Sequence, residues 1–448
     1  MKFGGTSVAD PDAVARLISI VRKERAPVVV VSALAKVTDG LVTVARLAED
    51  GEAQKATVSL RALLDRHLAV ATAVTTASRG ATLAAVRAEF DEAIGLVHAL
   101  AVLREVSPRS LDAVLSVGEV LSSRIVAAAL ADQGVASDWI DARRVLVTDA
   151  EHNAAAPDMD ATRARALEHI APRTSRGSAV VVGGFIGSTP SGVTTTLGRG
   201  GSDYSAAIFG ASLDAEEIQI WTDVDGMLTA DPRVVSEPRL VPRLTFAEAS
   251  ELAYFGAKVL HPSTILPAVD KNIPVRILNS RRPDNRGTLI TADGAAAAGE
   301  LTALACKRDV TVVDITSTRM LMAHGFLRRL FEVFERFKTP VDVVTTSEVS
   351  VSVTVDDTRR LDAIVENLRH FAQVSCEPEM AIICAVGENL RSDPMLFARA
   401  VTSLGRLPLR LVSQAASRRN ITLVLRDADV PEAMHRLHDA FFAVKVES

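Results

Sequence analysis

The sequence predicts an α/β domain with a mainly parallel central sheet and helices on both faces, followed by two smaller α+β modules. Short β-branched runs such as Val28–Val31 and 179–182 alternate with helical patterns over residues 1–290. Strands that alternate with helices favour a parallel sheet. Beyond residue 300 the pattern changes, and residues 349–355 alternate strictly between apolar and polar types. That alternation is typical of a half-buried antiparallel strand and predicts the smaller modules.

The composition excludes several classes of function. Formal net charge is −5 over 448 residues, and only 4% of residues are aromatic. A protein of this charge has no basic field for nucleic acid, and few aromatic side chains are available to stack on bases. We therefore expect no nucleic-acid partner.

The cysteines and the apolar runs indicate the compartment. Cys306, Cys376 and Cys384 lie outside metal-ligand spacings and are expected to be free thiols in a reducing cytoplasm. No uninterrupted apolar run reaches the ~18 residues of a membrane span. The first residues are polar and glycine-rich, unlike a signal peptide. We expect a cytoplasmic protein without a membrane partner.

Each element of the first domain has a local signal. Strands are predicted at 28–31, 179–182 and 217–221, and helices at 111–131 and 245–260. Each strand-like run is followed by a stretch rich in Gly, Ser or Thr. Ligands bind open α/β sheets beyond the carboxyl ends of their strands, so these stretches are the expected binding loops.

The C-terminal region reads as a repeat behind a linker. Residues 291–300 are small, polar and non-periodic, which predicts a linker. A stripe of Leu and Phe from Leu327 to Phe337 has helical spacing and predicts a core-facing helix. The same order of elements returns as a helix at 395–405, strands at 409–413 and 421–425, and a helix at 430–442. A repeat of about 70 residues present twice predicts paired modules and no solenoid.

The first chemical motif is Lys2-Phe3-Gly4-Gly5-Thr6-Ser7. Glycines let backbone N–H groups approach phosphate oxygens, and a following helix adds its positive end. The motif lacks the Walker A pattern, and an ordinary glycine turn is the alternative.

The second motif, at 194–204, carries Arg199 between glycines and Asp203 at the start of an alanine-rich helix. An arginine flanked by glycines can present its fork to a carboxylate. The alternative for Asp203 is a simple helix N-cap.

Two further motifs follow in the chain. Residues 221–227 place turn residues directly after a buried strand, which suits a nucleotide loop or a plain hairpin connection. Residues 255–262 contain Lys258, which could bind terminal phosphates or only complement a helix dipole. His261, before a proline, is expected to be structural.

Six segments in order resemble the aspartate kinases of the amino-acid kinase family. They lie at 2–7, 31–38, 118–119, 197–204, 221–226 and 255–262. The resemblance implies that the chain transfers the γ-phosphoryl group of ATP, with Mg²⁺, to the β-carboxylate of L-aspartate. This reaction gives 4-phospho-L-aspartate and opens the branch to lysine, threonine and methionine. A carboxylate is already an anion at neutral pH, so no general base is required.

The resemblance also implies roles for individual residues. The expected catalytic residues are Lys2, Asp203 and Lys258. The expected contacts to aspartate are Thr38, Glu119, Arg199 and Ser202. The expected contacts to ATP are Gly4, Gly5, Thr6, Ser7, Thr222, Asp223, Leu228, Arg233 and Lys258. Leu228 stands where relatives often carry tyrosine, which implies a weaker contact near adenine.

The C-terminal repeat resembles paired ACT domains, which are ferredoxin-like β-α-β-β-α-β modules that bind amino acids at their mutual interface. They are expected at 301–375 and 378–448, after a kinase domain at 1–290. The expected effector contacts are Met320, Gly325, Phe326, Leu327, Val341, Asp342, Thr346, Ser347 and Glu348. These residues look like the lysine-sensitive type, although Ala323 and Pro340 stand where that type often has serine. The resemblance implies feedback by L-lysine and a homodimer through these domains, or a tetramer.

Other interpretations stay open at this point. The chain could be a kinase for a glutamate-type substrate, or a catalytically inactive amino-acid sensor, and the modules could serve only to dimerise. The chain ends with the second module, so the monofunctional form is expected. Because Lys2 directly follows Met1, whereas relatives usually begin a few residues earlier, we expect either that the true start lies upstream or that the first strand is frayed and Lys2 is loosely held.

Overall fold

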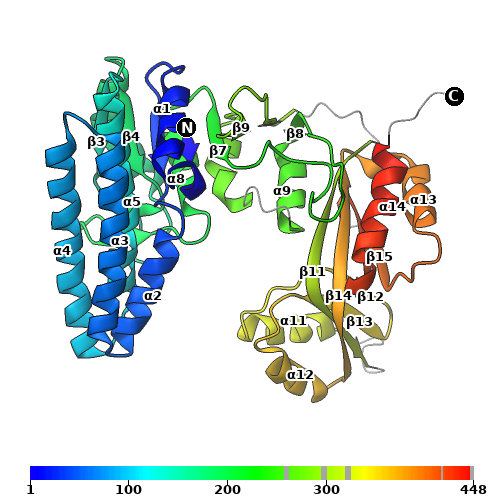
Figure 1. Ribbon diagram of the computed structural model, residues 1–448. Helices are drawn as coiled ribbons and strands as arrows, with labels where there is room; N and C mark the ends of the chain where they lie inside the picture. Colours follow the sequence, from blue (N-terminus) through cyan, green and yellow to red (C-terminus); the bar gives the residue numbers. More distant parts are fainter. Residues whose placement is uncertain (257–261, 294–299, 318–323, 415–416, 444–448) are drawn as a thin grey trace. The chain divides into compact units, whose positions relative to one another are not determined.

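The computed structural model describes residues 1–256, 262–293, 300–317, 324–414 and 417–443 (Figure 1). The chain divides into two compact units. The first unit comprises Met1–Met227 and Val259–Asp293, and the second comprises Leu228–Lys258 and Gly294–Ser448.

A mainly parallel sheet forms the centre of the first unit. Its strands, in spatial order, are β3 (Ser137–Ile140), β4 (Ala179–Gly183), β2 (Val28–Val31), β1 (Lys2–Phe3), β7 (Ile218–Thr222), β9 (Val275–Asn279) and β10 (Thr288–Thr291). β10 pairs antiparallel with β9, and the other neighbouring pairs are parallel. A separate hairpin joins β5 (Ile186–Ser188) to β6 (Thr194–Thr196). The predicted strands at 28–31 and 179–182 are confirmed, and the third begins one residue late.

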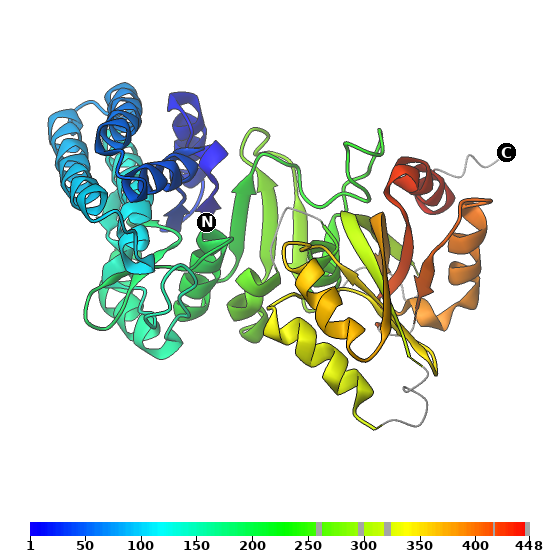
Figure 2. The same ribbon diagram turned by 90° about the horizontal axis from the view of Figure 1, so that it is seen from below.

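Helices surround this sheet. They are α1 (Pro11–Val21), α2 (Val37–Glu49), α3 (Ala53–Val74), α4 (Arg79–Leu103), α5 (Pro108–Asp132), α6 (Met159–His169), α7 (Ala171–Thr174), α8 (Gly201–Ser212) and α10 (Leu266–Asp270), with short 3₁₀ turns η1 (Gly5–Ser7), η2 (Ala142–Arg144) and η3 (Pro262–Ile265). α2, α3, α4 and α5 lie side by side (Figures 1 and 2). The predicted helix at 111–131 is confirmed as α5.

Both faces of the sheet are covered, as the sequence predicts. Val29 and Val181 belong to the core beneath α1 and α5. Val30 and Val180 point to the opposite face, because side chains alternate along a strand, and they are equally buried. A strand that is buried on both faces has a continuous run of apolar residues in its sequence, so these strands can be predicted from the sequence.

α5 also has the length and composition of a membrane-spanning helix. It is the one helix among the described residues that is both long enough and apolar enough to cross a membrane. However, 83% of its most apolar window is buried inside the protein. The hydrophobicity of α5 is that of a core helix. A few polar residues interrupt its apolar residues, so the sequence shows no apolar run of this length even though the helix as a whole is apolar.

The second unit is built on an antiparallel sheet. Its strands, in spatial order, are β12 (Val344–Thr346), β13 (Ser350–Val355), β11 (Leu301–Thr316), β14 (Gln373–Gly387), β16 (Asn420–Arg426) and β15 (Leu411–Ser413). β11 and β14 are long enough to run through both predicted modules. The start of β11 pairs with the end of β14, which also pairs with β16. Residues 301–307 therefore lie beside strands of the second predicted module, although they were assigned to the first. The predicted limits of the two modules, 301–375 and 378–448, stay a prediction.

Two cores lie against this sheet. α11 (Phe326–Arg336) and α12 (Leu361–Arg369) pack on one, and α13 (Pro394–Ser403) and α14 (Val430–Phe442) pack on the other. The predicted strand at 349–355 and the predicted repeat of helices and strands are confirmed. In the helical stripe Leu330 and Phe334 are buried, whereas Leu327 is 41% exposed.

A segment at 228–256 also belongs to the second unit. It contains β8 (Arg243–Thr245) and α9 (Phe246–Tyr254). Thr245 and Glu248 form a capping box that starts α9. The predicted helix at 245–260 was too long, because α9 ends at Tyr254 and Gly256 has φ of 111°. Residues 257–261, and residues 294–299 of the predicted linker, lie outside the described residues.

Candidate functional site

The first strand, β1, is firmly held. It pairs in parallel with β2 on one side and β7 on the other, so Lys2 lies opposite Val30 and Ile220. The Met1 ammonium donates to the Val28 carbonyl oxygen at 2.7 Å. Lys2 is only 9% exposed. The expectation of a frayed strand and a loosely held Lys2 was wrong, because a central strand gains backbone bonds on both edges.

Lys2 forms an ion pair with Asp203. Its Nζ lies 2.6 Å from Asp203 Oδ1, and both side chains are mostly shielded from water. The contact is an ion pair without good hydrogen-bond alignment, since that oxygen has no hydrogen-bond partner among the described residues. Asp203 lies in the first turn of α8, whose N-cap is Gly200 with φ of 71°. The N-cap interpretation of Asp203 was therefore wrong.

A cavity of about 770 Å³ opens beside this ion pair at the carboxyl ends of β1 and β2. Its wall brings together seven of the predicted residues: Lys2, Gly5, Thr38, Glu119, Arg199, Ser202 and Asp203. All seven come from the first unit. The cavity lies where ligands bind open α/β sheets, and it carries charges of both signs. A small zwitterion with an additional carboxylate would match this wall.

Glu119 supplies the buried carboxyl group of the cavity wall. Its side chain comes from α5, and the residue is 3% exposed. Oε1 accepts a hydrogen bond from the backbone N–H of Ala33 at 3.2 Å, while Oε2 has no partner in the described part of the chain. Burial raises the pKa of Glu119 to about 8, although the Ala33 N–H opposes this shift. A buried carboxylate with an unused oxygen is suited to an incoming cation.

Two glycines allow α5 to approach this closely. A Cβ at Gly118 would lie 2.8 Å from the Cβ of Ala33, and one at Gly183 would lie 3.0 Å from the Glu119 carbonyl oxygen. Distances this short leave no space for a side chain. The helix and the strand ends therefore place the carboxylate of Glu119 by direct backbone contact.

The expected ATP residues are only partly near the cavity. Five of them do not line it: Gly4, Thr6, Ser7, Thr222 and Asp223. The first three belong to the turn after β1, whereas Thr222 ends β7 and Asp223 follows it. Ser7 is buried, and its Oγ is 2.8 Å from the Oγ of Ser280. The hydroxyl of Ser7 therefore joins the turn after β1 to the segment after β9.

The loop after β7 is fixed by polar contacts that sequence reasoning missed. Asp225 Oδ1 accepts from Asn279 Nδ2 at 2.7 Å and from Asn285 Nδ2 at 3.2 Å. The Arg282 guanidinium lies 2.6 Å from its other oxygen. The polar residues Asn279 and Ser280 directly follow the apolar part of β9, which was the same signal that marked the other strand ends.

Other predicted residues fall elsewhere. Leu228 and Arg233 belong to the second unit, where Leu228 bridges to Leu240 and Arg233 Nε donates to Asp231 at 3.0 Å. Lys258, His261, Met320 and Ala323 lie outside the described residues.

The expected effector segment centres on a buried carboxylate, Asp342. Its side chain is 2% exposed, and its Oδ1 accepts from Lys307 Nζ at 2.7 Å and from the Tyr254 hydroxyl at 3.1 Å. Lys307 Nζ also lies 2.7 Å from Asp356. Burial raises the pKa of Asp342 above its ordinary value, although Lys307 opposes the shift. Its Oδ2 is buried without a partner among the described residues.

The remaining effector residues surround the start of α11 and the β12–β13 turn. Gly325, with φ of 82°, caps α11, and Phe326 and Leu327 begin that helix. Val341 is partly buried, whereas Thr346, Ser347 and Glu348 are exposed. Glu348 therefore lies in a different environment from Asp342. Lys307 and Tyr254 were missed, because neither stands in a recognisable motif.

Comparisons with known proteins agree with these observations. The amino acid kinase family matches residues 1–279, and an ACT domain matches residues 383–441. Aspartokinase 3, chloroplastic, from Arabidopsis thaliana is 38% identical over 99% of this chain and 81% of its own. Lysine-sensitive aspartokinase 3 from Escherichia coli is 35% identical over 98% of both chains.

Solved structures are similar over nearly the whole chain. The crystal structure of E. coli aspartokinase III in complex with aspartate and ADP has a TM-score of 0.85 at 35% identity, covering 98% of this chain and 99% of that one. The same protein in complex with lysine and aspartate gives a TM-score of 0.83, with 98% of both chains covered.

Proposed function

Because the chain belongs to the aspartokinases of the amino acid kinase family, we propose that it transfers the γ-phosphoryl group of ATP to the β-carboxylate of L-aspartate. The product is 4-phospho-L-aspartate. The single observation that carries the proposal is the cavity in which Lys2, Glu119, Arg199 and Asp203 meet. It offers an anion for an ammonium group, and cations for carboxylate and phosphoryl groups.

The chemistry asks for placement of charge more than for proton transfer. The attacking carboxylate is already ionised at neutral pH. Phosphoryl transfer is catalysed mainly by positioning and by neutralising charge on the phosphoryl oxygens. Lys2 supplies a cation at the cavity, and Asp203 holds that ammonium in place at 2.6 Å. Glu119 and Arg199 are suited to the α-ammonium group and a carboxylate of aspartate.

Mg²⁺ fits this set of donors. Phosphate oxygens and water usually supply most ligands of Mg²⁺, so one or two protein carboxylates are enough. Asp203 is the carboxylate beside Lys2, and its side chain is 16% exposed. When bound, the ion would neutralise charge on the ATP phosphates. Among the described residues, no group of three or more His, Cys, Asp or Glu could hold a metal alone.

We also propose L-lysine as the feedback effector. The support is the buried Asp342, whose Oδ2 is free to accept from a cationic amino acid. A homodimer is proposed through the ACT-type region, because β12 is an edge strand and carries Val344, which is 40% exposed. We propose a cytoplasmic location, since Cys306, Cys376 and Cys384 are free thiols.

ATP-dependent formation of an acyl phosphate, trapped as a hydroxamate, tests the function directly. We expect product with L-aspartate and none above background with L-glutamate. Lys2→Met should abolish product while Lys23→Met, at an exposed lysine of α1's C-terminal flank, should not. Product with glutamate alone would overturn the substrate assignment, and no product with either would favour an inactive sensor. Light scattering during size-exclusion chromatography tests the dimer.

A further inference from the structure

Asn153 lines the cavity, yet no motif in the sequence singled it out. It lies in the loop between η2 and α6, at 145–158. The same wall carries Glu119 and Arg199, together with Leu111 and Leu115 from α5. The question is whether Asn153 is only part of the wall or a residue that contacts the substrate.

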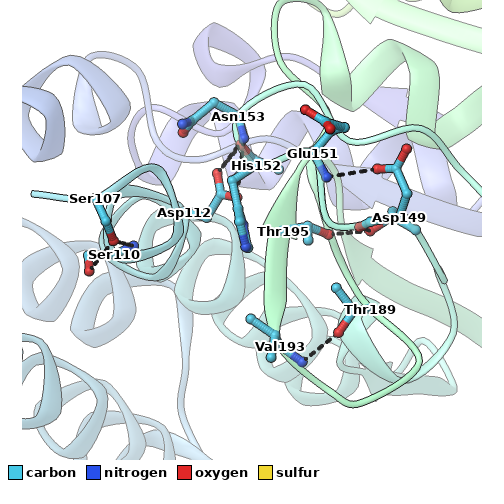
Figure 3. Close-up of polar contacts among 12 residues, drawn as sticks. Ser107, Ser110, Asp112, Asp149, Glu151, His152, Asn153, Thr189, Val193 and Thr195 are labelled. Atoms are coloured by element: carbon cyan, nitrogen blue, oxygen red, sulfur yellow. Dashed lines mark hydrogen bonds and ion pairs between the residues drawn. The ribbon is translucent and has the colours of Figure 1, made fainter.

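A buried carboxylate holds the Asn153 backbone from behind. Asp112 of α5 is fully buried, and both of its oxygens accept from the Asn153 N–H at 3.2 Å. Asp112 Oδ2 lies 2.7 Å from His152 Nδ1, and Oδ1 accepts from Thr196 Oγ1 at 2.5 Å. Figure 3 shows His152 and Asn153 converging on Asp112. The loop is thereby fixed to a core helix and to β6.

The backbone at Asn153 is unusual. Its φ is 68°, in the left-handed region, which asparagine tolerates better than most residues. A Cβ at Gly198 would lie 2.9 Å from the Asn153 carbonyl oxygen, so the loop that carries Arg199 passes directly against this residue. Asn153 and Arg199 are therefore neighbouring parts of one wall.

The side chain has hydrogen-bonding capacity that the protein does not use. In Figure 3 it points away from Asp112. Asn153 Oδ1 is enclosed by protein and has no partner among the described residues. The carboxamide therefore has hydrogen-bonding capacity to spare at a residue that lines the cavity. Strained backbone and an unsatisfied buried polar atom both cost free energy, and such features concentrate at functional sites.

The amino acid that accepts the phosphoryl group carries more negative than positive groups. At neutral pH an aspartate-type substrate has two carboxylates and one ammonium group. Glu119 can serve the ammonium group, and Arg199 one carboxylate. Asp112 and Glu119 are seven residues apart on α5, which separates them by about 10 Å along the helix axis. The Asn153 end of the cavity is therefore suited to a substrate group other than the one that Glu119 binds.

We propose that Asn153 is a substrate-binding residue whose amide N–H donates to a carboxylate of the acceptor amino acid beside Arg199. Asp112 acts as its positioning residue, through the backbone N–H. The inference rests on the proposed function and adds a neutral donor to a site otherwise built from charges. A neutral amide holds a carboxylate without competing for the charge of Lys2.

Two substitutions at one position test the direction of this hydrogen bond. Asn153→Gly keeps a backbone that accepts positive φ and removes only the carboxamide. Asn153→Asp keeps the size of the side chain and replaces the donor with an anion. We expect the KM for aspartate to rise by about ten- to thirtyfold in the glycine variant, the lower part of the range for one hydrogen bond to a charged group. The aspartate variant should be worse, because like charges repel.

Asn272→Gly is the matched control. Asn272 is exposed, has φ of 53° and does not line the cavity. Its substitution should leave both KM values unchanged, and Asn153→Gly should leave kcat and the KM for ATP unchanged. An unchanged KM for aspartate in Asn153→Gly, or a better KM in Asn153→Asp than in Asn153→Gly, would overturn the proposal.

Failure of the proposed function would look different. In that case the wild-type chain would form no acyl phosphate with aspartate. Calorimetric titration of L-aspartate into the wild type and into Asn153→Gly then tests the contact without turnover. Equal affinities would overturn the role of Asn153, and weaker binding to the variant would support it.

Discussion

Glu119 in the first unit and Asp342 in the second are both buried carboxylates with one unused oxygen, but only Asp342 has a cation beside it. Lys307 Nζ lies 2.7 Å from Asp342, whereas no ion pair to Glu119 occurs in the described parts of the chain. Burial raises the pKa of both groups, to about 8 for Glu119. A carboxylate without a partner holds a proton until a cationic ligand arrives. One with an internal cation must exchange that cation for the ligand.

The largest expected effect is on Glu119. Glu119→Gln keeps the shape of the side chain and removes its ability to become an anion. We expect kcat/KM for aspartate to fall by on the order of a hundredfold, because a hydrogen bond to a charged group is lost in a buried site. Steady-state kinetics at saturating ATP measure this change.

Glu89→Gln is the matched control for that variant. Burial also raises the pKa of Glu89, but this residue does not line the cavity. Its substitution should leave kcat/KM within about twofold of the wild type. Equal losses in the two variants would mean that the effect is structural and that Glu119 does not contact the substrate.

The pH profile gives the second effect. Only the ionised form of Glu119 can pair with an ammonium group, and its pKa is about 8 in the free protein. Below that pH, kcat/KM for aspartate should rise by up to about tenfold per pH unit and then level off. A profile that is already flat at neutral pH would show that Glu119 is ionised before the substrate binds.

Stability should follow the opposite direction. The folded chain holds a proton on Glu119 that the unfolded chain releases between its ordinary pKa of 4.5 and about 8. The stabilisation is therefore complete at low pH and is lost as the pH rises through about 8. The side chain in Glu119→Gln cannot ionise. As the pH rises through this range, the free energy of unfolding of the variant should therefore increase relative to that of the wild type by up to about 1.4 kcal/mol per pH unit. Urea unfolding at several pH values measures the difference.

How far the sequence predicted these features depends on how local their signals are. Val28–Val31 became a buried strand because a parallel strand is a continuous apolar run. β11 was not anticipated as one strand, since polar residues 307–309 interrupt it and its partner β14 is remote in the chain. Long-range pairing of this kind leaves no local pattern.

The same distinction applies to the sites. Glu119 and Arg199 were found because they lie in segments with a recognisable resemblance, and the structure brings both to one cavity. Asn153 and Lys307 gain their importance from contacts with Asp112 and Asp342. Nothing in the residues next to them indicates those partners. The cavity was therefore predictable in outline, and the residues that complete it were not.

The third prediction removes the internal cation. Lys307→Met leaves Asp342 buried without its partner, so a cationic effector no longer has to displace an ammonium group. We expect the L-lysine concentration for half-inhibition to fall by about three- to tenfold, because the ammonium group of the effector can then pair with Asp342 without displacing Lys307. Inhibition curves at fixed aspartate measure it.

Asp342→Asn is the opposing variant. It removes the anion and should raise the half-inhibitory concentration, while activity without lysine is retained. If both variants shift the curve in the same direction, Lys307 and the effector do not compete for one carboxylate, and the contrast with Glu119 loses its basis.

The smallest effect is expected at Tyr254, which connects Asp342 to α9. The Tyr254 hydroxyl donates to Asp342 at 3.1 Å, and burial helps to raise the pKa of the phenol to about 12, so it remains a donor. Two residues later, a Cβ at Gly256 would lie 2.3 Å from the Cys306 carbonyl oxygen, so the chain after α9 rests on β11 beside Lys307. In sequence, Lys258 follows Tyr254 by four residues.

Tyr254→Phe removes this hydrogen bond and keeps the ring, over which Lys307 Nζ lies 5.4 Å from the centroid. Because Asp342 retains Lys307, we expect the half-inhibitory lysine concentration to change by only about two- to fivefold, the worth of one ordinary hydrogen bond. If the hydroxyl carries the effector signal into α9, maximal inhibition should also become incomplete. A parallel shift with full inhibition would instead make Tyr254 a part of the effector site alone, and α9 would need another connection to Asp342.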